Sequence, residues 1–406
     1  MFVRELYQKG VYRLKAVRKC VKLAVCFALT ASMLLIQGTT GTADTNGNNA
    51  GGRTFRIAYC ESEAFINYSK TSYWLLKAME EVGLVGDLSG MQYRDGDVET
   101  AEMWKWLSEH KASGWKVEFV ENAWFSIGTE MLAGADREKI IEKIGKRMKE
   151  GDLDLIIAMG TDAGKVLSSL SLPVDVMVFS ASNPIKSGIV KAAESSGVSG
   201  IWAHVDLNRF KRQLRVINDT FKPQQVGVVY ENSDNARIYS AIEDIESVAS
   251  QYGFSIERIF VDEPKSEGDK ERYYNELKSA YRQLSEKVDA FYLTVASIEK
   301  ERLQWLLEPF MEKGIPVFSQ LGADEVEYGA LMSITAVDFK NVARFGTDVI
   351  GKAIAGAKLE ELPQQYESTP MIIVNLSTAE KIGFQVPFEM LLIADAVYTK
   401  SEVVSK

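Results

Sequence analysis

Short apolar runs alternate with amphipathic stretches from residue 55 to about residue 320, and this alternation constrains the fold more than any other feature of the chain. Apolar runs of four to eight residues between turn residues are typical of buried strands. Apolar residues spaced by three or four are typical of helices that cover a sheet. Strands separated by helices pair in parallel through right-handed crossovers. The pattern therefore predicts an α/β fold.

The alternation occurs twice, which predicts two doubly wound, Rossmann-like lobes joined by a hinge. A chain of 406 residues, of which 46% are hydrophobic, has enough apolar material for two cores. The first set of expected elements comprises strands at 55–60, 115–121, 153–160 and 174–181 and helices at 71–83, 137–151 and after residue 160. The second set comprises strands at 225–231, 255–262, 289–295 and 315–320 and helices at 207–221, 236–253, 272–287 and 299–314.

The first 43 residues have the features of an export signal. Seven basic residues precede the apolar run 23–36, and Gly41, Thr42 and Ala43 supply the small residues that a signal peptidase needs. A retained membrane anchor is the alternative, but the run is shorter than the roughly 20 residues that span a bilayer. We expect cleavage near Ala43, a linker at 44–53 and a periplasmic protein.

Charge, cysteine and histidine content exclude several classes of function. Loss of residues 1–43 changes the formal net charge from −9 to −15, which argues against nucleic acid and anionic membranes as partners. Cys60 is then the single cysteine, and the two histidines, His110 and His204, lie far apart. We therefore expect no disulfide, no metal site and no cofactor. With no catalytic triad pattern and no nucleotide fingerprint in view, we expect no enzymatic activity and no catalytic residues.

The stretch "GTDAGK" at 160–165 resembles a phosphate-binding loop but lacks its spacing. Such a loop needs four residues between its glycines and a Ser or Thr after the lysine. Here three residues separate Gly160 from Gly164, and Val166 follows Lys165. The turn still starts a helix whose free N–H groups suit a carboxylate, so both simple helix capping and ligand contact stay open.

Small polar and aromatic residues follow several of the expected strands, where a doubly wound sheet binds its ligand. Ser180, Ser182 and Asn183 end one buried strand, and residues 232–235 (NSDN) end another. Both segments can equally be turns with helix caps. Aromatic residues after the first strand can wall an apolar pocket: Phe65, Tyr68, Tyr73 and Trp74.

Five segments make the chain resemble the exported solute-binding proteins of ATP-binding-cassette (ABC) importers, and more narrowly the family that includes tryptophan-binding proteins. They are "DLIIAMGTDAGKVL", "PVDVMVFSASNPIKSGIV", "FKPQQVGVVYENSDNA", the stretch from Gly314 to Gly356, and "MIIVNLSTAEKIGFQVPFEMLLIADAVY". The resemblance covers residues 150–398. It implies a type I periplasmic-binding fold with three crossovers between lobes.

The same resemblance implies domain boundaries and ligand positions. The first lobe would comprise residues 54–202 and 338–358, the second 203–337 and 359–398, with a tail at 399–406. The implied ligand-binding positions are Thr161, Asp162, Ala163, Ser180, Asn183, Asn232, Asn235, Thr294 and Asp338, to which the aromatic reasoning adds Tyr68. The sequence departs from the family pattern at Asn183, at residues 234–236 and at Val295 and Ala296.

We expect the lobes to close on a small zwitterion or carboxylate, with helix N-termini and hydroxyls on its carboxylate and Asp206 or Asp338 on its amino group. An aromatic or apolar amino acid is one such ligand. The partner would be an ABC permease in the membrane, and the protein a monomer. A ligand sensor that feeds a signalling receptor is the first alternative, and an enzyme is the second and less favoured one.

Overall fold

The computed structural model describes residues 53–95, 97–110, 114–128, 135–170, 172–264, 267–294, 298–334, 338–399 and 402–405. They belong to one compact unit, residues 49–406. The predicted signal segment 1–43, its cleavage site, almost all of the linker, and Val295 and Ala296 lie outside the described residues. No described helix is both long enough and apolar enough to cross a membrane.

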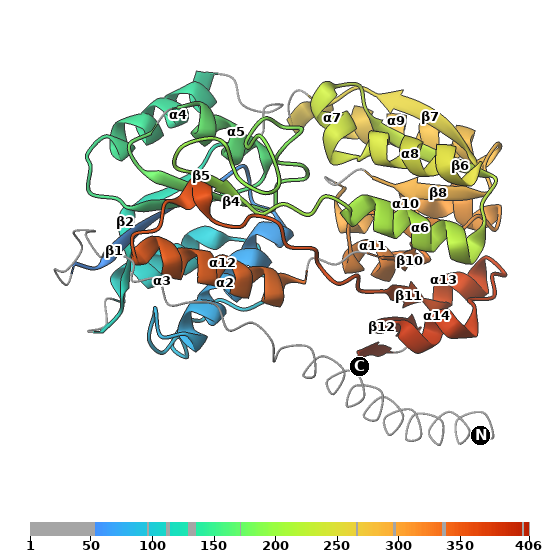
Figure 1. Ribbon diagram of the computed structural model, residues 1–406. Coiled ribbons are helices and arrows are strands. Elements are labelled where there is room, and N and C mark those ends of the chain that lie inside the picture. The colour runs from blue at the N-terminus through green and yellow to red at the C-terminus, as the bar shows by residue number, and fades with distance from the viewer. Residues whose placement is uncertain are drawn as a thin grey trace, which may run out of the picture. The chain divides into compact units, whose positions relative to one another are not determined.

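The first sheet has five parallel strands in the order β2-β1-β3-β4-β5 (Figure 1). Its strands are β1 (Phe55–Glu61), β2 (Val117–Ser126), β3 (Leu155–Met159), β4 (Asp175–Phe179) and β5 (Ile201–Ala203). Every residue of β3 is buried, because this central strand is covered on both faces.

Helices pack on both faces of the first sheet, as a doubly wound topology requires. They are α2 (Ile66–Glu81), α3 (Thr100–Glu109), α4 (Ala135–Met148), α5 (Thr161–Ser169) and α12 (Phe339–Ile354). One core lies beneath α2, α3 and α12, and a second lies beneath α4 and α5. Helix α12 contacts α2 although more than 250 residues separate them in sequence (Figure 1).

The second sheet has eight strands in the order β13-β12-β11-β10-β9-β8-β6-β7. Most neighbours are parallel, whereas β10 with β11 and β12 with β13 are antiparallel. The strands are β6 (Gln225–Glu231), β7 (Ser255–Val261), β8 (Ala290–Leu293), β9 (Val317–Ser319), β10 (Met332–Ser333), β11 (Ile373–Asn375), β12 (Ala396–Thr399) and β13 (Glu402–Ser405).

Helices also cover both faces of the second sheet. One core receives side chains from α6 and α8, and the other from α9 and α10. The helices of this half are α6 (Arg209–Phe221), α7 (Asp234–Tyr239), α8 (Ile242–Tyr252), α9 (Lys270–Ser285), α10 (Lys300–Glu312), α11 (Ala323–Glu327), α13 (Leu376–Lys381) and α14 (Phe388–Ile393), with 3-10 turns η1 (Glu267–Asp269) and η2 (Leu359–Glu361). The predicted fold class, two doubly wound α/β lobes, is thereby confirmed.

The predicted helix over 236–253 is wrong as a single element. The chain forms α7 and α8 instead, and Ala241 between them has a left-handed backbone with φ 53°. The periodicity continues through the break because Ala236, Ile242 and Ile245 all enter the same core. Periodicity alone therefore could not reveal it.

Residues 102–110 (EMWKWLSEH), for which the sequence predicted no element, fall almost entirely within α3. Trp104 is buried, and its Nε1 donates a hydrogen bond to the Val120 carbonyl of β2 at 3.0 Å. Trp106 is only partly buried and stacks on the His110 ring. The segment is thus a covering helix of the first sheet.

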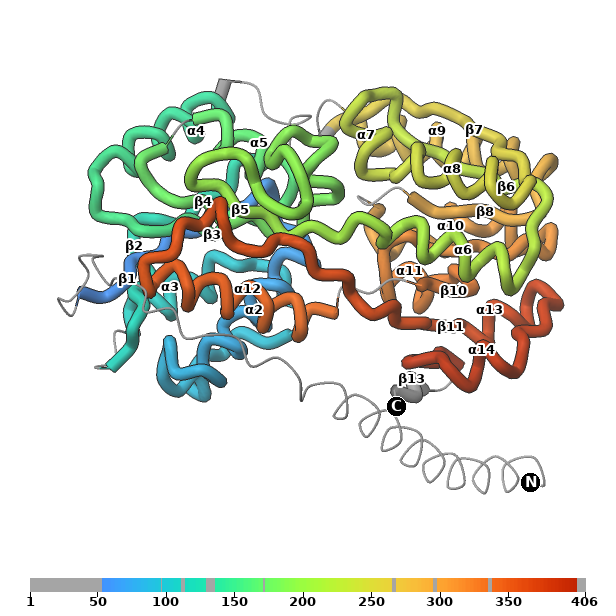
Figure 2. The backbone as a smooth tube through the Cα atoms, in the orientation of Figure 1, coloured from blue at the N-terminus to red at the C-terminus, as the bar shows by residue number. Residues whose placement is uncertain are grey.

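Several segments carry the chain between the two sheets, and Figure 2 shows them as smooth tubes. One follows β5 and leads to α6, and another follows α12 and leads to β11. The second crossing is tied to the first sheet, since Trp202 Nε1 donates to the Pro363 carbonyl at 2.7 Å and Gln364 Oε1 accepts from the Ala203 N–H at 3.1 Å. Leu359 and Leu362 also lie in the first core. The domain boundaries themselves stay a prediction.

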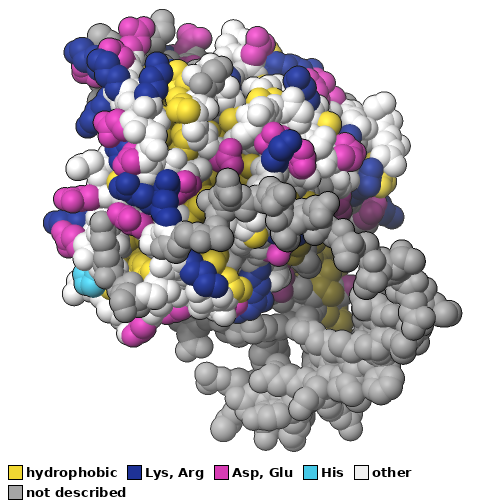
Figure 3. All heavy atoms as spheres, turned by 60° about the vertical axis from the view of Figure 1, so that its left-hand side comes forward, with side chains coloured by type: hydrophobic (Ala, Val, Ile, Leu, Met, Phe, Trp, Pro, Cys, Tyr) yellow, Lys and Arg dark blue, Asp and Glu magenta, His cyan; other side chains and the backbone are white. Residues whose placement is uncertain are grey.

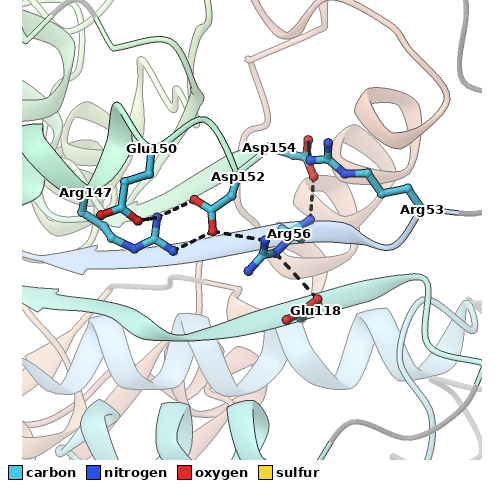
Figure 4. A network of polar contacts seen from close by, with 7 residues as sticks. All are labelled: Arg53, Arg56, Glu118, Arg147, Glu150, Asp152 and Asp154. Atoms are coloured by element: carbon cyan, nitrogen blue, oxygen red, sulfur yellow. Dashed lines mark hydrogen bonds and ion pairs between the residues drawn. The ribbon is translucent and has the colours of Figure 1, made fainter.

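Ion pairs fasten the amino ends of β1 and β2 and the loop before β3 (Figure 4). Arg56 reaches Glu118 at 3.7 Å and Asp152 at 3.1 Å, while Arg147 also binds Asp152. The Arg56 N–H donates to Asp154 at 2.8 Å. This network fixes the end of the first sheet that lies opposite to its carboxyl edge.

Basic and acidic side chains are interspersed over the face of the molecule drawn in Figure 3.

Candidate functional site

A cavity lies at the carboxyl ends of the strands and takes its walls from both sheets and from the crossings between them. This is where a doubly wound fold binds ligands. The first-sheet side contributes Phe65, Asn67, Thr71, Ser180, Ala181, Ser182 and Val342, the crossings contribute His204, Asp206 and Ser368, and the second-sheet side contributes Arg209, Phe210, Tyr239, Thr294, Gln320 and Leu321.

Arg209 is the cation of this cavity, and its guanidinium has no hydrogen bond or ion pair with any described residue. It stands at the start of α6, over the ring of Phe210 at 4.4 Å from the centroid. Burial lowers the pKa of the guanidinium, against the opposite effect of Asp206 and Asp244. An arginine side chain keeps its charge in proteins. The cavity wall therefore contains a positively charged donor group that makes no hydrogen bond with any described residue, with Asp206 and Asp244 close enough to act on its charge.

Asp206 also lines the cavity, but its carboxylate is already bound. Arg212 NH2 lies 2.7 Å from one oxygen and 2.9 Å from the other, and the Ser368 N–H donates to Asp206 at 3.0 Å. Arg212 sits one helical turn after Arg209 on α6. Within this helical turn the Asp206 carboxylate therefore forms its ion pair with Arg212 and not with Arg209.

His204 presents a hydrogen-bond acceptor to the cavity. Its Nε2 lies 3.0 Å from the Tyr366 carbonyl, which can only accept, so Nε2 carries the proton. Burial lowers the pKa of the imidazole, which favours the neutral ring at pH 7. The lone pair of Nδ1 is then available to a ligand.

Ser180 offers a second neutral acceptor. Thr71 Oγ1 donates to the Asn67 carbonyl at 2.7 Å, so the 3.1 Å contact between Thr71 and Ser180 uses the Ser180 proton. The Ser180 oxygen keeps free lone pairs. Its backbone is left-handed, with φ 56°, a conformation that costs a non-glycine residue energy and that clusters at functional sites.

Tyr239 supplies an aromatic wall whose hydroxyl is bound elsewhere. The buried Glu231 accepts hydrogen bonds from both Tyr239 and Tyr273. The Tyr239 carbonyl accepts from Gln320 Nε2 at 2.8 Å. The hydrogen bond to Glu231 thus fixes the position of the Tyr239 ring in the cavity wall.

Two of the predicted ligand-binding residues, Ser180 and Thr294, line the cavity. Thr294 donates its hydroxyl to the Val229 carbonyl at 2.8 Å, so only its lone pairs are free to contact a ligand. The other eight predicted residues are not among the lining residues.

The predicted anion turn at the start of α5 is occupied by the chain's own side chains. The Ala163 N–H donates to Ser62 Oγ at 3.0 Å, and Thr161 Oγ1 accepts from the Ser182 N–H at 3.2 Å. Tyr68 packs over Gly160 with its ring 5.1 Å from that of Phe65. Asp162, in the first turn of α5, is partly exposed. Tyr68 and Thr161 therefore support residues that do line the cavity.

The remaining predicted residues lie on loops, at a helix cap and, for Asn235, in the first turn of α7. Asn183 caps a local turn by accepting from the Lys186 N–H at 2.9 Å, and Asn232 is exposed. Asn235 accepts from Lys165 Nζ at 3.2 Å. Asp338 caps α12 by accepting from the Asn341 N–H at 3.1 Å.

The sequence reasoning missed Arg209, His204, Tyr239 and Gln320. A signal for Arg209 exists, because "HVDLNRF" places three ionisable residues in the first crossing between the lobes. No group of metal-ligating residues occurs among the described residues, and Cys60 is a buried free thiol.

Comparison with known proteins places the chain in context. Residues 128–398 match the model of the family described as ABC transporter substrate binding protein. A tyrosine-binding protein of Clostridioides difficile (strain R20291) is 20% identical over 380 residues, which cover 91% of this chain and 93% of the relative.

Solved structures share the fold at low sequence identity. The ABC domain from Streptococcus pneumonia in complex with L-Trp gives a TM-score of 0.62 at 17% identity, covering 85% of this chain and 100% of that one. The ligand-free, open structure of a substrate-binding protein with adhesive properties from Clostridium difficile gives 0.60 at 16% identity, covering 85% and 99%.

Proposed function

Because the chain belongs to the family of ABC transporter substrate-binding proteins, we propose that it captures a small, amino-acid-like or carboxylate ligand in its cavity and delivers it to a membrane permease. The observation that carries this proposal is the Arg209 guanidinium in the cavity wall, which makes no hydrogen bond or ion pair with the part of the chain that the structure describes. A guanidinium binds a carboxylate through two parallel hydrogen bonds, the strongest neutral-pH pairing available to such a ligand.

The other walls suit a ligand with an aromatic or apolar group. The rings of Phe65, Phe210 and Tyr239 provide apolar surface, and hydroxyl and imidazole acceptors provide orientation. The tyrosine-binding relative and the L-Trp complex of a protein with this fold favour an aromatic side chain.

Capture would proceed by closure of the two lobes about the crossing segments. The cavity takes residues from both lobes, so a bound ligand contacts both and favours the closed arrangement. Of the predicted ligand residues, we retain Ser180 and Thr294 as direct contacts, and we assign Tyr68 and Thr161 to the support of the wall.

The test is a thermal-shift screen of the purified full chain against amino acids and aromatic acids, with native mass spectrometry to detect a retained ligand. A ligand that binds the folded state raises the melting temperature with its concentration. Arg209→Ala should abolish the rise, whereas Arg215→Ala, which removes an exposed arginine of the same helix, should leave it unchanged. If the ligand raises the melting temperature of the Arg209→Ala variant as much as that of the unchanged protein, Arg209 is not part of the binding site.

A further inference from the structure

We propose that Gln320 selects aromatic ligands whose ring carries a hydrogen-bond donor, an O–H or an N–H, over aromatic ligands without one. This inference rests on the proposed function and names the residue that recognises the ligand's side chain. It is drawn from a buried acceptor atom in the cavity wall that has no donor in the described chain.

The Gln320 side-chain amide is held in one orientation by the chain. Gln320 directly follows β9, is 3% exposed and lines the cavity. Its Nε2 donates to the Tyr239 carbonyl at 2.8 Å, and a carbonyl oxygen can only accept, so the nitrogen must lie on that side. The amide therefore cannot turn over without losing this hydrogen bond.

The oxygen of the same amide lacks a partner. Gln320 Oε1 is buried and makes no hydrogen bond with any residue that the structure describes. A buried acceptor in this state is unfavourable, and a donor brought by a ligand would remove that cost.

Two hydroxyl groups line the same side of the cavity, but their protons are used elsewhere. The Tyr239 hydroxyl donates to Glu231. The Thr294 hydroxyl donates to a backbone carbonyl of β6. Neither proton is available to Gln320, so the ligand is the source of the missing donor.

A neutral ring donor suits this acceptor better than the ammonium group of an amino acid does. The charged residues that the structure describes in the wall, Asp206 and Arg209, lie where the first crossing enters α6. Together they carry no net charge, as a zwitterionic amino acid does, so we expect the ligand's charged groups beside them. Gln320 shares its part of the wall with Leu321 and the Tyr239 ring, and its amide oxygen is uncharged. It therefore matches a phenol O–H or an indole N–H.

The other neutral acceptors of the wall lie on the side of the first sheet. Ser180 directly follows β4, and His204 directly follows β5, the neighbouring strand. Ser180 Oγ and His204 Nδ1 are available to the N–H groups of the ammonium. The donors at the two ends of an aromatic amino acid thus have separate acceptors.

The test is isothermal titration of the full chain with pairs of amino acids that have the same shape and differ in one ring donor. L-tyrosine is compared with 4-methyl-L-phenylalanine, and L-tryptophan with 3-benzothienyl-L-alanine, in which sulfur replaces the indole N–H. In at least one pair we expect the member with the donor to bind at least about tenfold more tightly, because the other leaves Gln320 Oε1 unpaired. The pair that shows the preference identifies the donor.

Gln320→Met should abolish this preference, because methionine has a similar length but no amide. The readout is the ratio of the two dissociation constants within a pair, since a purely structural defect would weaken both members alike. Gln213→Met is the matched control. Gln213 is also a buried glutamine, but it accepts from the Tyr292 hydroxyl and is not among the residues that line the cavity. Its replacement should leave the ratio unchanged.

Equal affinities within both pairs, or a preference that survives Gln320→Met, would overturn the inference and leave the proposed function intact. If none of the four amino acids binds, the proposed aromatic ligand fails together with the inference.

Discussion

Lys186 Nζ lies 2.7 Å from a carboxylate oxygen of Glu243, and this ion pair joins the loop after β4 of the first sheet to α8 beside the second. Lys165 of α5 and Asn235 of α7 make a second such contact at 3.2 Å. Both contacts link elements of different sheets. Opening of the lobes at this edge would break them.

Charge reversal at this ion pair should weaken ligand binding. Lys186→Glu places two like charges together in the closed arrangement, and exposed pairs of this kind contribute up to about 1 kcal/mol. We therefore expect the dissociation constant to rise about two- to fivefold at low salt. The double reversal Lys186→Glu with Glu243→Lys should restore it. Failure of that restoration, measured by titration calorimetry, would argue against a role of the pair in closure.

Removal of the Tyr239 hydroxyl should affect both stability and affinity. Tyr239→Phe takes one hydrogen-bond donor from the buried Glu231, which should cost about 1–3 kcal/mol in the free energy of unfolding. The ring of residue 239 is then no longer held by a hydrogen bond in the cavity wall, so we expect the affinity for the ligand to fall. Tyr273→Phe removes the other donor to Glu231 from a residue outside the cavity wall. It should destabilise the protein similarly but leave affinity unchanged, and equal affinities for both variants would contradict the positioning role.

The stability of the protein should depend on Glu61. Burial raises the pKa of this carboxyl to about 7, although Thr100 and Tyr59 donate hydrogen bonds to it at 2.7 and 2.8 Å. The native state therefore holds a proton that the unfolded state releases, and this contribution to stability is lost as the pH rises from about 4.5 to about 7.

Glu61→Gln should remove this part of the pH dependence, because glutamine keeps the acceptor oxygen and cannot ionise. We expect the free energy of unfolding of the unchanged protein to fall by up to about 3 kcal/mol relative to the variant between pH 4.5 and pH 8. Urea unfolding across this range measures the difference. Parallel pH curves for the two proteins would show that Glu61 does not titrate in this window.

Gly160→Ala should be strongly destabilising. Gly160 has φ 95°, and a Cβ atom there would lie 2.6 Å from Ser62 Oγ and would overlap the Tyr68 hydroxyl. The backbone strain and the steric clash together should lower the free energy of unfolding by at least about 2 kcal/mol. Gly145→Ala is the matched control, since it lies within α4 with open space around it and should be neutral or slightly stabilising. Urea midpoints of the two variants provide the comparison.

Much of the fold was predictable because its elements follow from local periodicity. The strand at 225–231 was predicted residue for residue, and the helix expected at 207–221 begins at Arg209 and ends at Phe221. A buried strand between two helical layers must be apolar over its whole length, so its sequence marks it directly. The break at Ala241 escaped prediction because both helices bury residues in one core.

The site was less predictable, because side-chain partners depend on positions that the chain brings together from far apart. Asp206 was one of two residues, with Asp338, expected to hold a ligand's amino group, and the structure pairs it with Arg212 and the Ser368 N–H. The N–H groups at the start of α5 looked available, but Ser62 accepts from one of them. No local pattern reveals such competition.

The sequence by itself therefore determined the two α/β lobes and the edge of the sheets at which we propose that a ligand binds, because hydrophobic periodicity and strand ends are local properties of the chain. Only the tertiary structure decided which polar groups remain free at that edge. Hydrogen bonds and ion pairs form between neighbours in space, and the crossings at 203–209 and 359–368 bring Arg212 and Ser368 to Asp206, while Arg209 makes no hydrogen bond or ion pair with any residue that the structure describes.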